Sequence, residues 1–388
     1  MNEPALQRAN ERMYGRYLGQ LALVLVVAML LCGAVNLFVD PYMLFRVEAI
    51  RSLPLDLTFE REIRFNLISA RRPKTLFLGA SQVAIAFDPR DPVVPDRAAF
   101  NAGIDGGTLS ESDRLLRQAT KVGRVGRVIL GLSYNATGHV GPDRFNDLFL
   151  KDSADPFKQV EAFFSVAMLR SSAKAVFDGF SGRPSQMNDD GQLTSAPLRR
   201  QVRGYGSVRA AFDSLTRPDT GHISKFIGSL RQLLADACRA HAEVTVALLP
   251  DHAVNLELFA AAGQWGLFEQ WKREVVAVDA RAACPVRTVD FEDYNFVTTE
   301  PLPPKGSSRA MMYYWDPGHF TAAAGRFVLQ RVFANAGGLK ATPRSFGNDL
   351  DPGNVESALR RVDQERRVYE AANRSEVLSI VADVNASR

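Results

Sequence analysis

The stretch that decides the fold is TLFLGASQVAIAFDP, from Thr75 to Pro89. Its apolar run stops abruptly at a glycine, and a single serine, Ser81, follows two residues later. A short continuous apolar run is typical of a strand that is buried on both faces of a sheet. Ser81 then has two interpretations, because it could be the N-cap of a following helix or a nucleophile held at the carboxyl edge of the sheet.

From Lys74 onward, short apolar runs alternate with helical patterns. Further strands are expected within residues 98–103, 124–134, 243–250 and 286–292, and helices within 108–123, 224–241 and 256–284. Thr108 followed by Glu111 is a capping-box pattern, which predicts where the first of these helices begins. Strands that alternate with helices indicate an α/β fold with a mostly parallel sheet and helices on both faces.

The N-terminal region contains an uncharged, strongly apolar run over residues 18–39. At about 1.5 Å per residue, a helix of this length covers the hydrocarbon core of a bilayer. Three arginines precede the run, and positive residues stay on the cytoplasmic side. We therefore predict a cytoplasmic tail (1–16), a transmembrane helix (17–39) and a domain exported across a bacterial-type inner membrane to the periplasm or the exterior. A cleaved signal peptide is the alternative, although its apolar region is normally shorter.

Composition and cysteine use narrow the class of protein further. The net charge is only +4 over 388 residues, and no basic stripe with interleaved aromatics is present, so no nucleic-acid partner is predicted. Cys32 lies in the apolar run, while Cys238 and Cys284 could pair in an oxidising compartment or stay buried as free thiols. Neither CxxC nor HExxH occurs, and the histidines are scattered, so no metal and no cofactor are predicted.

Three other segments complete the predicted organisation. Residues 40–73 are expected to form a membrane-proximal linker, because they combine charge with several turn residues. The main domain is expected over 74–340, with an insertion or lid at about 178–220 that is rich in Gly, Pro and Ser. Beyond it, residues 341–388 are expected to form a helical tail whose apolar positions recur at helical spacing.

A second polar group stands near the far end of the chain, in YYWDPGHFTAAAGRFVL. Asp316 and His319 are three residues apart on a loop that is expected to enter a helix. A serine hydroxyl becomes a good nucleophile when an imidazole takes its proton and a carboxylate orients that imidazole. Ser81, His319 and Asp316 therefore form the predicted catalytic set. The backbone N–H of Ser81 and that of Gly103, in FNAGIDGG, are the candidate oxyanion donors.

These blocks make the sequence resemble a known superfamily. LFLGASQV, FNAGIDGGT and YWDPGHFTAAAG look like blocks of the SGNH/GDSL hydrolases, in the membrane-anchored branch that includes alginate O-acetyltransferases. The resemblance implies a three-layer α/β/α flavodoxin-like sandwich, with Ser81 as nucleophile, Asp316 and His319 as the DxxH pair and Gly103 as the glycine of the second block.

The chain departs from that family pattern in two blocks. Ala80 replaces the aspartate of Gly-Asp-Ser, and residues 131–134 read Gly-Leu-Ser-Tyr where the third block usually reads Gly-x-Asn-Asp. The oxyanion-hole asparagine is therefore absent in register, and Asn135 is the candidate that could replace it. His252 follows a predicted strand and is a rival base or a substrate contact. Trp315 could stack on a sugar ring or could simply anchor its loop.

Two functions from different classes follow from these patterns. The first is an exported, anchored serine enzyme, an O-acyltransferase or an esterase, which acts on an envelope or secreted polysaccharide through an acyl-enzyme on Ser81. Its partners would be the polysaccharide, the inner membrane and a membrane acyl-transfer protein. The second is a non-catalytic binding or assembly protein of a polysaccharide secretion complex. The separation of Ser81 Oγ from His319 distinguishes the two, because catalysis requires about 2.6–3.2 Å.

Overall fold

The computed structural model describes most of the chain as two compact units. The described residues are 3–45, 53–151, 156–195, 198–199, 209–210, 223–307, 309–334 and 346–386. One unit comprises Met1–Asn66 and Asn146–Ser185, and the other comprises Leu67–Phe145 and Gln186–Arg388. The second, larger unit contains the predicted catalytic residues, and the first contains the predicted membrane helix.

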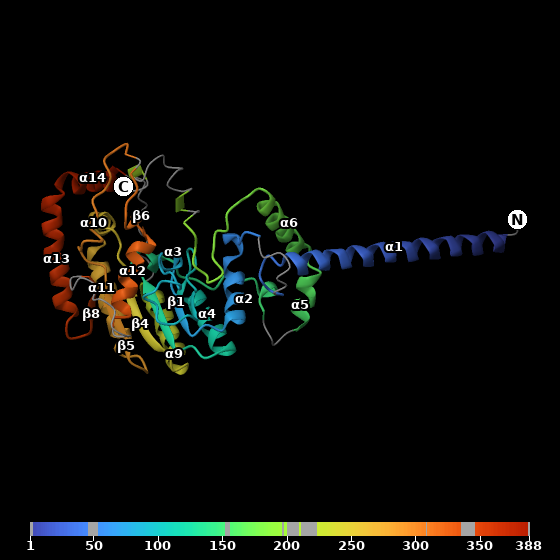
Figure 1. The fold of residues 1–388 in the computed structure, drawn as a ribbon, viewed down its shortest axis with the longest axis horizontal. Coiled ribbons are helices and arrows are strands. Elements are labelled where there is room, and N and C mark those ends of the chain that lie inside the picture. The colour runs from blue at the N-terminus through green and yellow to red at the C-terminus, as the bar shows by residue number, and fades with distance from the viewer. Residues whose placement is uncertain are drawn as a thin grey trace. The chain divides into compact units, whose positions relative to one another are not determined.

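The larger unit is built on a six-stranded sheet (Figure 1) with the strand order β2-β1-β3-β4-β5-β8. Its strands are β1 (Thr75–Leu78), β2 (Ala99–Asn101), β3 (Arg127–Leu132), β4 (Glu243–Leu248), β5 (Val286–Asp290) and β8 (Asn348–Leu350). The first five strands pair in parallel, and β8 pairs antiparallel with β5. The predicted α/β class with a mostly parallel sheet is therefore confirmed.

Helices pack on the sheet and on one another. They are α3 (Ser81–Ala86), α4 (Leu109–Val122), α9 (Ile223–Arg239), α10 (Ala253–Ala261), α11 (Trp265–Asp279), α12 (Ala322–Val332), α13 (Val355–Ala372) and α14 (Arg374–Ala386). On one face, Phe77 and Ile129 of the sheet join a core with Val328 and Leu329 of α12. The helices α4, α9 and α11 pack one against the next, α9 contacts β4, and α11 contacts β5.

Local sequence signals explain how individual elements begin and are held. The Thr108 side chain accepts from the Glu111 amide, and the Glu111 side chain accepts in return, so the predicted capping box starts α4. Cys238, in the last turn of α9, forms a disulfide with Cys284, which precedes β5, at a Cα–Cα separation of 5.4 Å. The interpretation of these two cysteines as free thiols is therefore wrong.

The smaller unit is formed by α1 (Glu3–Val39), η2 (Leu57–Phe59), η4 (Asp147–Phe149), α5 (Pro156–Phe163) and α6 (Val166–Phe180). Its core holds the Tyr42 ring stacked on Phe149, with ring centroids 4.1 Å apart, together with Leu44 and Met168. Within α1, residues Arg12–Val39 are long and apolar enough to cross a membrane. The structure thus contains the candidate span that the sequence predicts.

Several predicted boundaries differ from the observed elements. The expected linker over 40–73 contains the buried residues Tyr42 and Leu44 and the helix α2 (Glu60–Arg71), because its apolar side chains find partners in the fold. The sheet strand β8 and the buried faces of α13 and α14 lie beyond residue 340, so the sheet domain extends into the expected tail.

The expected insertion is only partly described by the structure. Much of the predicted insertion or lid, residues 178–220, lies outside the described residues. Two described residues of this range hydrogen-bond to α3: the Leu193 amide donates to Ala84 O at 2.8 Å, and Gln192 Nε2 donates to Ile85 O at 3.2 Å. This part of the insertion therefore lies against α3, the helix that follows β1.

Candidate active site

Glycine makes the turn between β1 and α3 possible. Gly79 has a φ of +146°, and a Cβ at this position would approach Gly131 O and Val83 Cγ2 to 2.6 Å each. Any other side chain would be strained here and would clash with the backbone of β3. The turn therefore brings the first residue of α3, Ser81, directly onto the carboxyl edge of the sheet.

The N-cap interpretation of Ser81 is wrong. The N-cap of α3 is Ala80, which makes no side-chain capping bond, and Ser81 is the first helical residue. The Ser81 Oγ lies 2.9 Å from Nε2 of His319, which is 238 residues away along the chain. The serine side chain therefore reaches across to a separate element.

His319 and Asp316 come from a small antiparallel hairpin, β6 (Tyr314–Asp316) and β7 (His319–Phe320). His319 Nδ1 lies 2.9 Å and 2.8 Å from the two carboxylate oxygens of Asp316. Because a carboxylate only accepts, Nδ1 carries the proton and Nε2 is left to accept from the Ser81 hydroxyl. The helix α12 starts later, with Thr321 as its N-cap, so Asp316 is not a helix cap.

Opposing effects set the charge state of His319, whose side chain is 27% exposed. Burial lowers its pKa, whereas the charge of Asp316 and the hydrogen bond that Nδ1 donates to that carboxylate raise it. The charges of Asp105 and Asp251 raise it further, and the resulting pKa lies above the ordinary value of a histidine. Carboxylates around the ring thus favour the imidazolium, which a general base becomes when it takes a proton.

A buried polar network adjoins Ser81 and His319, and no local sequence pattern predicts it. Gln82 Nε2 donates to Asp251 Oδ1 at 2.6 Å and to Gly318 O at 2.7 Å. Asp251 Oδ2 in turn accepts from Ser133 Oγ at 3.3 Å and from Asn255 Nδ2 at 3.1 Å. Burial raises the pKa of Asp251 to about 7, against the effect of these donors. Gln82 therefore ties the helix of Ser81 to the backbone beside His319.

Of the predicted oxyanion donors besides Ser81, Gly103 lies against the turn that carries Ser81, since a Cβ on it would stand 3.0 Å from Ala80 O, and Asn135 lies beside Gly318. The N–H of Gly103 donates to Asn101 Oδ1 at 2.9 Å, so this amide is engaged and does not serve as the predicted donor. Asn135, at the start of η3 (Asn135–Gly138), is exposed beside the hairpin. Its Nδ2 lies 3.9 Å from where a Cβ on Gly318 would stand.

His252 is not positioned as a base or a substrate contact. It is buried, its Nδ1 accepts from the Val254 amide at 3.1 Å, and its Nε2 donates to Glu300 O at 2.9 Å. Burial lowers the pKa of His252 to about 4, and it therefore stays neutral and caps α10.

Trp315 occupies the partly exposed side of the catalytic hairpin. It lies between Tyr314 and Asp316 in β6, both of which are buried, and its own side chain is half-buried. The guanidinium carbon of Arg199, from the predicted insertion, lies 6.0 Å from the Trp315 ring centroid. An aromatic face and a cation from the insertion thus meet at the strand that carries Asp316.

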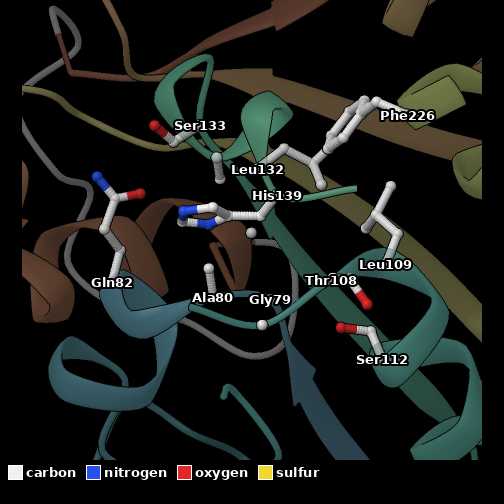
Figure 2. Close-up of a pocket in the computed structure, with 13 residues that line it drawn as sticks. Gly79, Ala80, Gln82, Thr108, Leu109, Ser112, Leu132, Ser133, His139 and Phe226 are labelled. Carbon is white, nitrogen blue, oxygen red and sulfur yellow. The ribbon is translucent and has the colours of Figure 1, made fainter. Parts of the chain in front are cut away.

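A small cavity of about 20 Å³ adjoins the turn that carries Ser81 (Figure 2). Ala80 and Gln82, the two neighbours of Ser81, form part of its wall, and the apolar side chains of Leu109 and Phe226 line another part. His139 also lines it, and Figure 2 shows this ring between Gln82 and Phe226. A volume of this size holds about one water molecule or a methyl-sized group.

Comparisons with known proteins do not assign this chain to a family. No protein-family model matches the sequence, and no curated protein matches it. One solved structure that matches is a protein from Streptococcus pneumonia described as "a putative platelet activating factor". It is 13% identical, the match covers 72% of this chain and 94% of that chain, and the TM-score is 0.37. A likeness this weak does not establish a shared fold or activity.

Proposed function

We propose that the protein is an exported, membrane-anchored serine enzyme that transfers acyl groups through an acyl-enzyme on Ser81. The observation that carries the proposal is the unbroken chain of contacts from Ser81 Oγ to His319 Nε2, at 2.9 Å, and from His319 Nδ1 to Asp316, at 2.8 Å. The separation falls within the 2.6–3.2 Å that proton transfer requires, whereas the scaffold alternative needs no such alignment.

The proposed fold is the three-layer, flavodoxin-like sandwich of the SGNH hydrolases. The parallel order of the first five strands, 2-1-3-4-5, supports this assignment, because flavodoxin-like sheets have the same order. The position of the site supports it as well. In such sheets, ligands bind outside the carboxyl ends of the strands, which is where Ser81 lies.

In the proposed reaction, Ser81 Oγ attacks the carbonyl carbon of an acyl donor while His319 Nε2 takes the hydroxyl proton. His319 then gives that proton to the leaving oxygen of the donor, which leaves the acyl group as an ester on Ser81. Asp316 holds the imidazole in the required tautomer and stabilises its charged form. The acyl group next passes to a sugar hydroxyl or to water: His319 removes the proton of that acceptor, the ester bond to Ser81 breaks, and His319 returns the proton to Ser81 Oγ.

The oxyanion of the intermediate would be stabilised by amide donors at the start of α3. The first N–H groups of a helix have no acceptor within the helix, and the Ser81 amide is one of them. The exposed amide of Asn135 beside Gly318 is the proposed side-chain donor, in place of the engaged Gly103.

The proposed location and acceptor are supported by other features. The apolar span of α1 supports anchoring in an inner membrane, and the disulfide Cys238–Cys284 supports export to an oxidising compartment. The half-buried Trp315 with Arg199 above it supports a carbohydrate acceptor, because aromatic faces pack on sugar rings. Anchoring favours a polysaccharide transferase that receives its acyl group from a membrane partner.

A product assay tests the proposal and separates its branches. The purified full chain would be incubated with an activated acetyl ester, with and without oligosaccharide acceptors, and acetate and acetylated sugar would be quantified. Acetylated sugar identifies a transferase, and acetate alone identifies an esterase. The Ser81→Ala variant should form neither, while Ser357→Ala, on the exposed side of α13, should match the wild type. Equal rates in Ser81→Ala and the wild type would favour the assembly-protein alternative.

A further inference from the structure

The helices α5 and α6 of the smaller unit expose large apolar side chains. On α5, Val160 is 55% exposed, and on α6, Val166, Phe177 and Phe180 are 60%, 63% and 90% exposed. The α6 residues recur at intervals typical of one helix face, and exposed Arg170 lies within the same stretch. Single exposed apolar residues are common on protein surfaces, but several aligned along one helix face are typical of a surface that binds a partner.

The turn between α5 and α6 is bonded to α1 inside the apolar span. Asn36 Nδ2 donates to Phe163 O at 2.9 Å and to Ser165 O at 3.0 Å, and Ser172 Oγ donates to Asn36 Oδ1 at 3.3 Å. A Cβ on Gly33 would meet the Phe163 ring at 2.0 Å, so only glycine allows this approach. The hairpin thus satisfies the side chain of a buried asparagine within an otherwise apolar helix.

These contacts fix the level of the hairpin along α1. Gly33 lies six residues before Val39, the last residue of the span, which is about 9 Å at 1.5 Å per residue. Figure 1 shows α5 and α6 at this end of α1, and both helices contact it. At the same level, Leu31 and Phe38 of α1 are exposed. Exposed apolar side chains of the hairpin and of the span therefore occur at the same end of α1.

We propose that α5 and α6 form an interfacial hairpin that lies in the outer headgroup region of the bilayer beside α1. The occupant of the exposed face is lipid, because a helix that crosses the bilayer at Gly33 places the turn within it. Amphipathic helices of interfacial proteins lie about 5–10 Å into the headgroup and acyl boundary, with basic residues directed to the headgroups. Arg170 is placed to make such a contact. The inference rests on the proposed anchoring of α1.

Lipid-borne quenching tests this placement in the full chain. Cys32→Ala removes the free thiol, and single cysteines are then introduced as Val160→Cys or Phe180→Cys and labelled with an environment-sensitive fluorophore. Glu161→Cys and Ser181→Cys, at the exposed polar neighbours, are the matched controls. Each protein is reconstituted into phosphatidylcholine–phosphatidylglycerol vesicles, with or without lipids that carry a nitroxide near the headgroup.

Quenching should be at least about threefold stronger at 160 and 180 than at 161 and 181. Flotation with the vesicles is measured on the same samples. Protein that floats while all four labels stay unquenched would overturn the hairpin but keep the anchor, and the face would then be assigned to a protein partner. Protein that fails to float would overturn the anchor and the hairpin together. Neither outcome concerns the serine chemistry, which the product assay measures separately.

Discussion

At the scale of single residues, the account depends on Ser81, His319 and Asp316. The proximity of these three side chains was predictable because each stands in a recognisable pattern: a serine follows a buried strand, and an aspartate lies three residues before a histidine. The role of Gly103 was predicted wrongly, because the acceptor of an amide depends on how a neighbouring side chain turns. Here the Asn101 side chain accepts from that amide.

The orienting role of Asp316 predicts a large loss of turnover in Asp316→Asn with the fold retained. An asparagine amide can donate where the carboxylate only accepted, which favours the wrong tautomer of His319. We expect kcat to fall by about 10²- to 10³-fold. Steady-state kinetics of ester hydrolysis, with circular dichroism as the folding control, measure this. Activity within about threefold of the wild type would remove Asp316 from the catalytic set.

The charge of Asp105 predicts a shift in the pH dependence of the reaction. A general base must be neutral, so kcat/KM should rise with pH through the pKa of His319, which lies above its ordinary value. Asp105 raises that pKa, so Asp105→Asn should move the rising limb to lower pH. The shift should shrink in high salt, because the aspartate is exposed and its charge is screened. A limb that moves to higher pH would contradict the electrostatic account.

At the scale of elements, alternating strands and helices made the parallel sheet predictable from the sequence. The strand β8 was not predictable, because three residues without an apolar pattern give no signal of their own. Similarly, a helix was expected directly after His319, yet the catalytic pair sits on the β6–β7 hairpin, with α12 starting at Ala322. The Gln82–Asp251 contact joins two residues that are 169 positions apart in the sequence, and no local pattern predicts it.

The bridge formed by Gln82 predicts that its removal lowers both stability and turnover, and that the loss of turnover exceeds the loss in a variant of similar stability. Gln82→Ala removes the donor to Asp251 and Gly318 and should cost about 1–3 kcal/mol of unfolding free energy. It should also lower kcat by about tenfold or more, because His319 loses its fixed position relative to α3.

Gln118→Ala is the matched control, since this buried glutamine donates to Ser69 Oγ at 2.6 Å, outside the site. It should cost similar stability and leave kcat near that of the wild type. Denaturant unfolding and steady-state kinetics on both variants measure the difference. Equal kcat losses in the two variants would show that Gln82 acts only on stability.

At the scale of the whole molecule, buried carboxyl groups predict how stability depends on pH. Burial raises the pKa of Asp279 to about 7, and one of its oxygens accepts from Thr288 Oγ1 at 2.7 Å. A raised pKa in the folded state stabilises the fold fully below the unfolded value of about 3.9. That stabilisation is lost as pH rises through about 7. Asp279 therefore opposes folding under alkaline conditions.

Asp279→Asn keeps the acceptor for Thr288 and removes the ionisation. At pH ~8 it should raise the unfolding free energy by about 1–2 kcal/mol, and the gain should shrink toward pH ~5. Thermal unfolding of the full chain across this range, in detergent, measures the effect. A gain that is the same at both pH values, or larger at the lower one, would contradict the assignment of a raised pKa.

The most direct measurement of the central claim is covalent trapping with a fluorophosphonate. The reagent forms a stable phosphonate ester only with a serine whose hydroxyl an adjacent base activates. Peptide mapping by mass spectrometry should place a single adduct on Ser81 in the wild type. Labelling should be lost in Ser81→Ala and strongly slowed in His319→Ala. Full occupancy in Ser81→Ala, or a folded wild type that stays unlabelled, would contradict the serine-enzyme account.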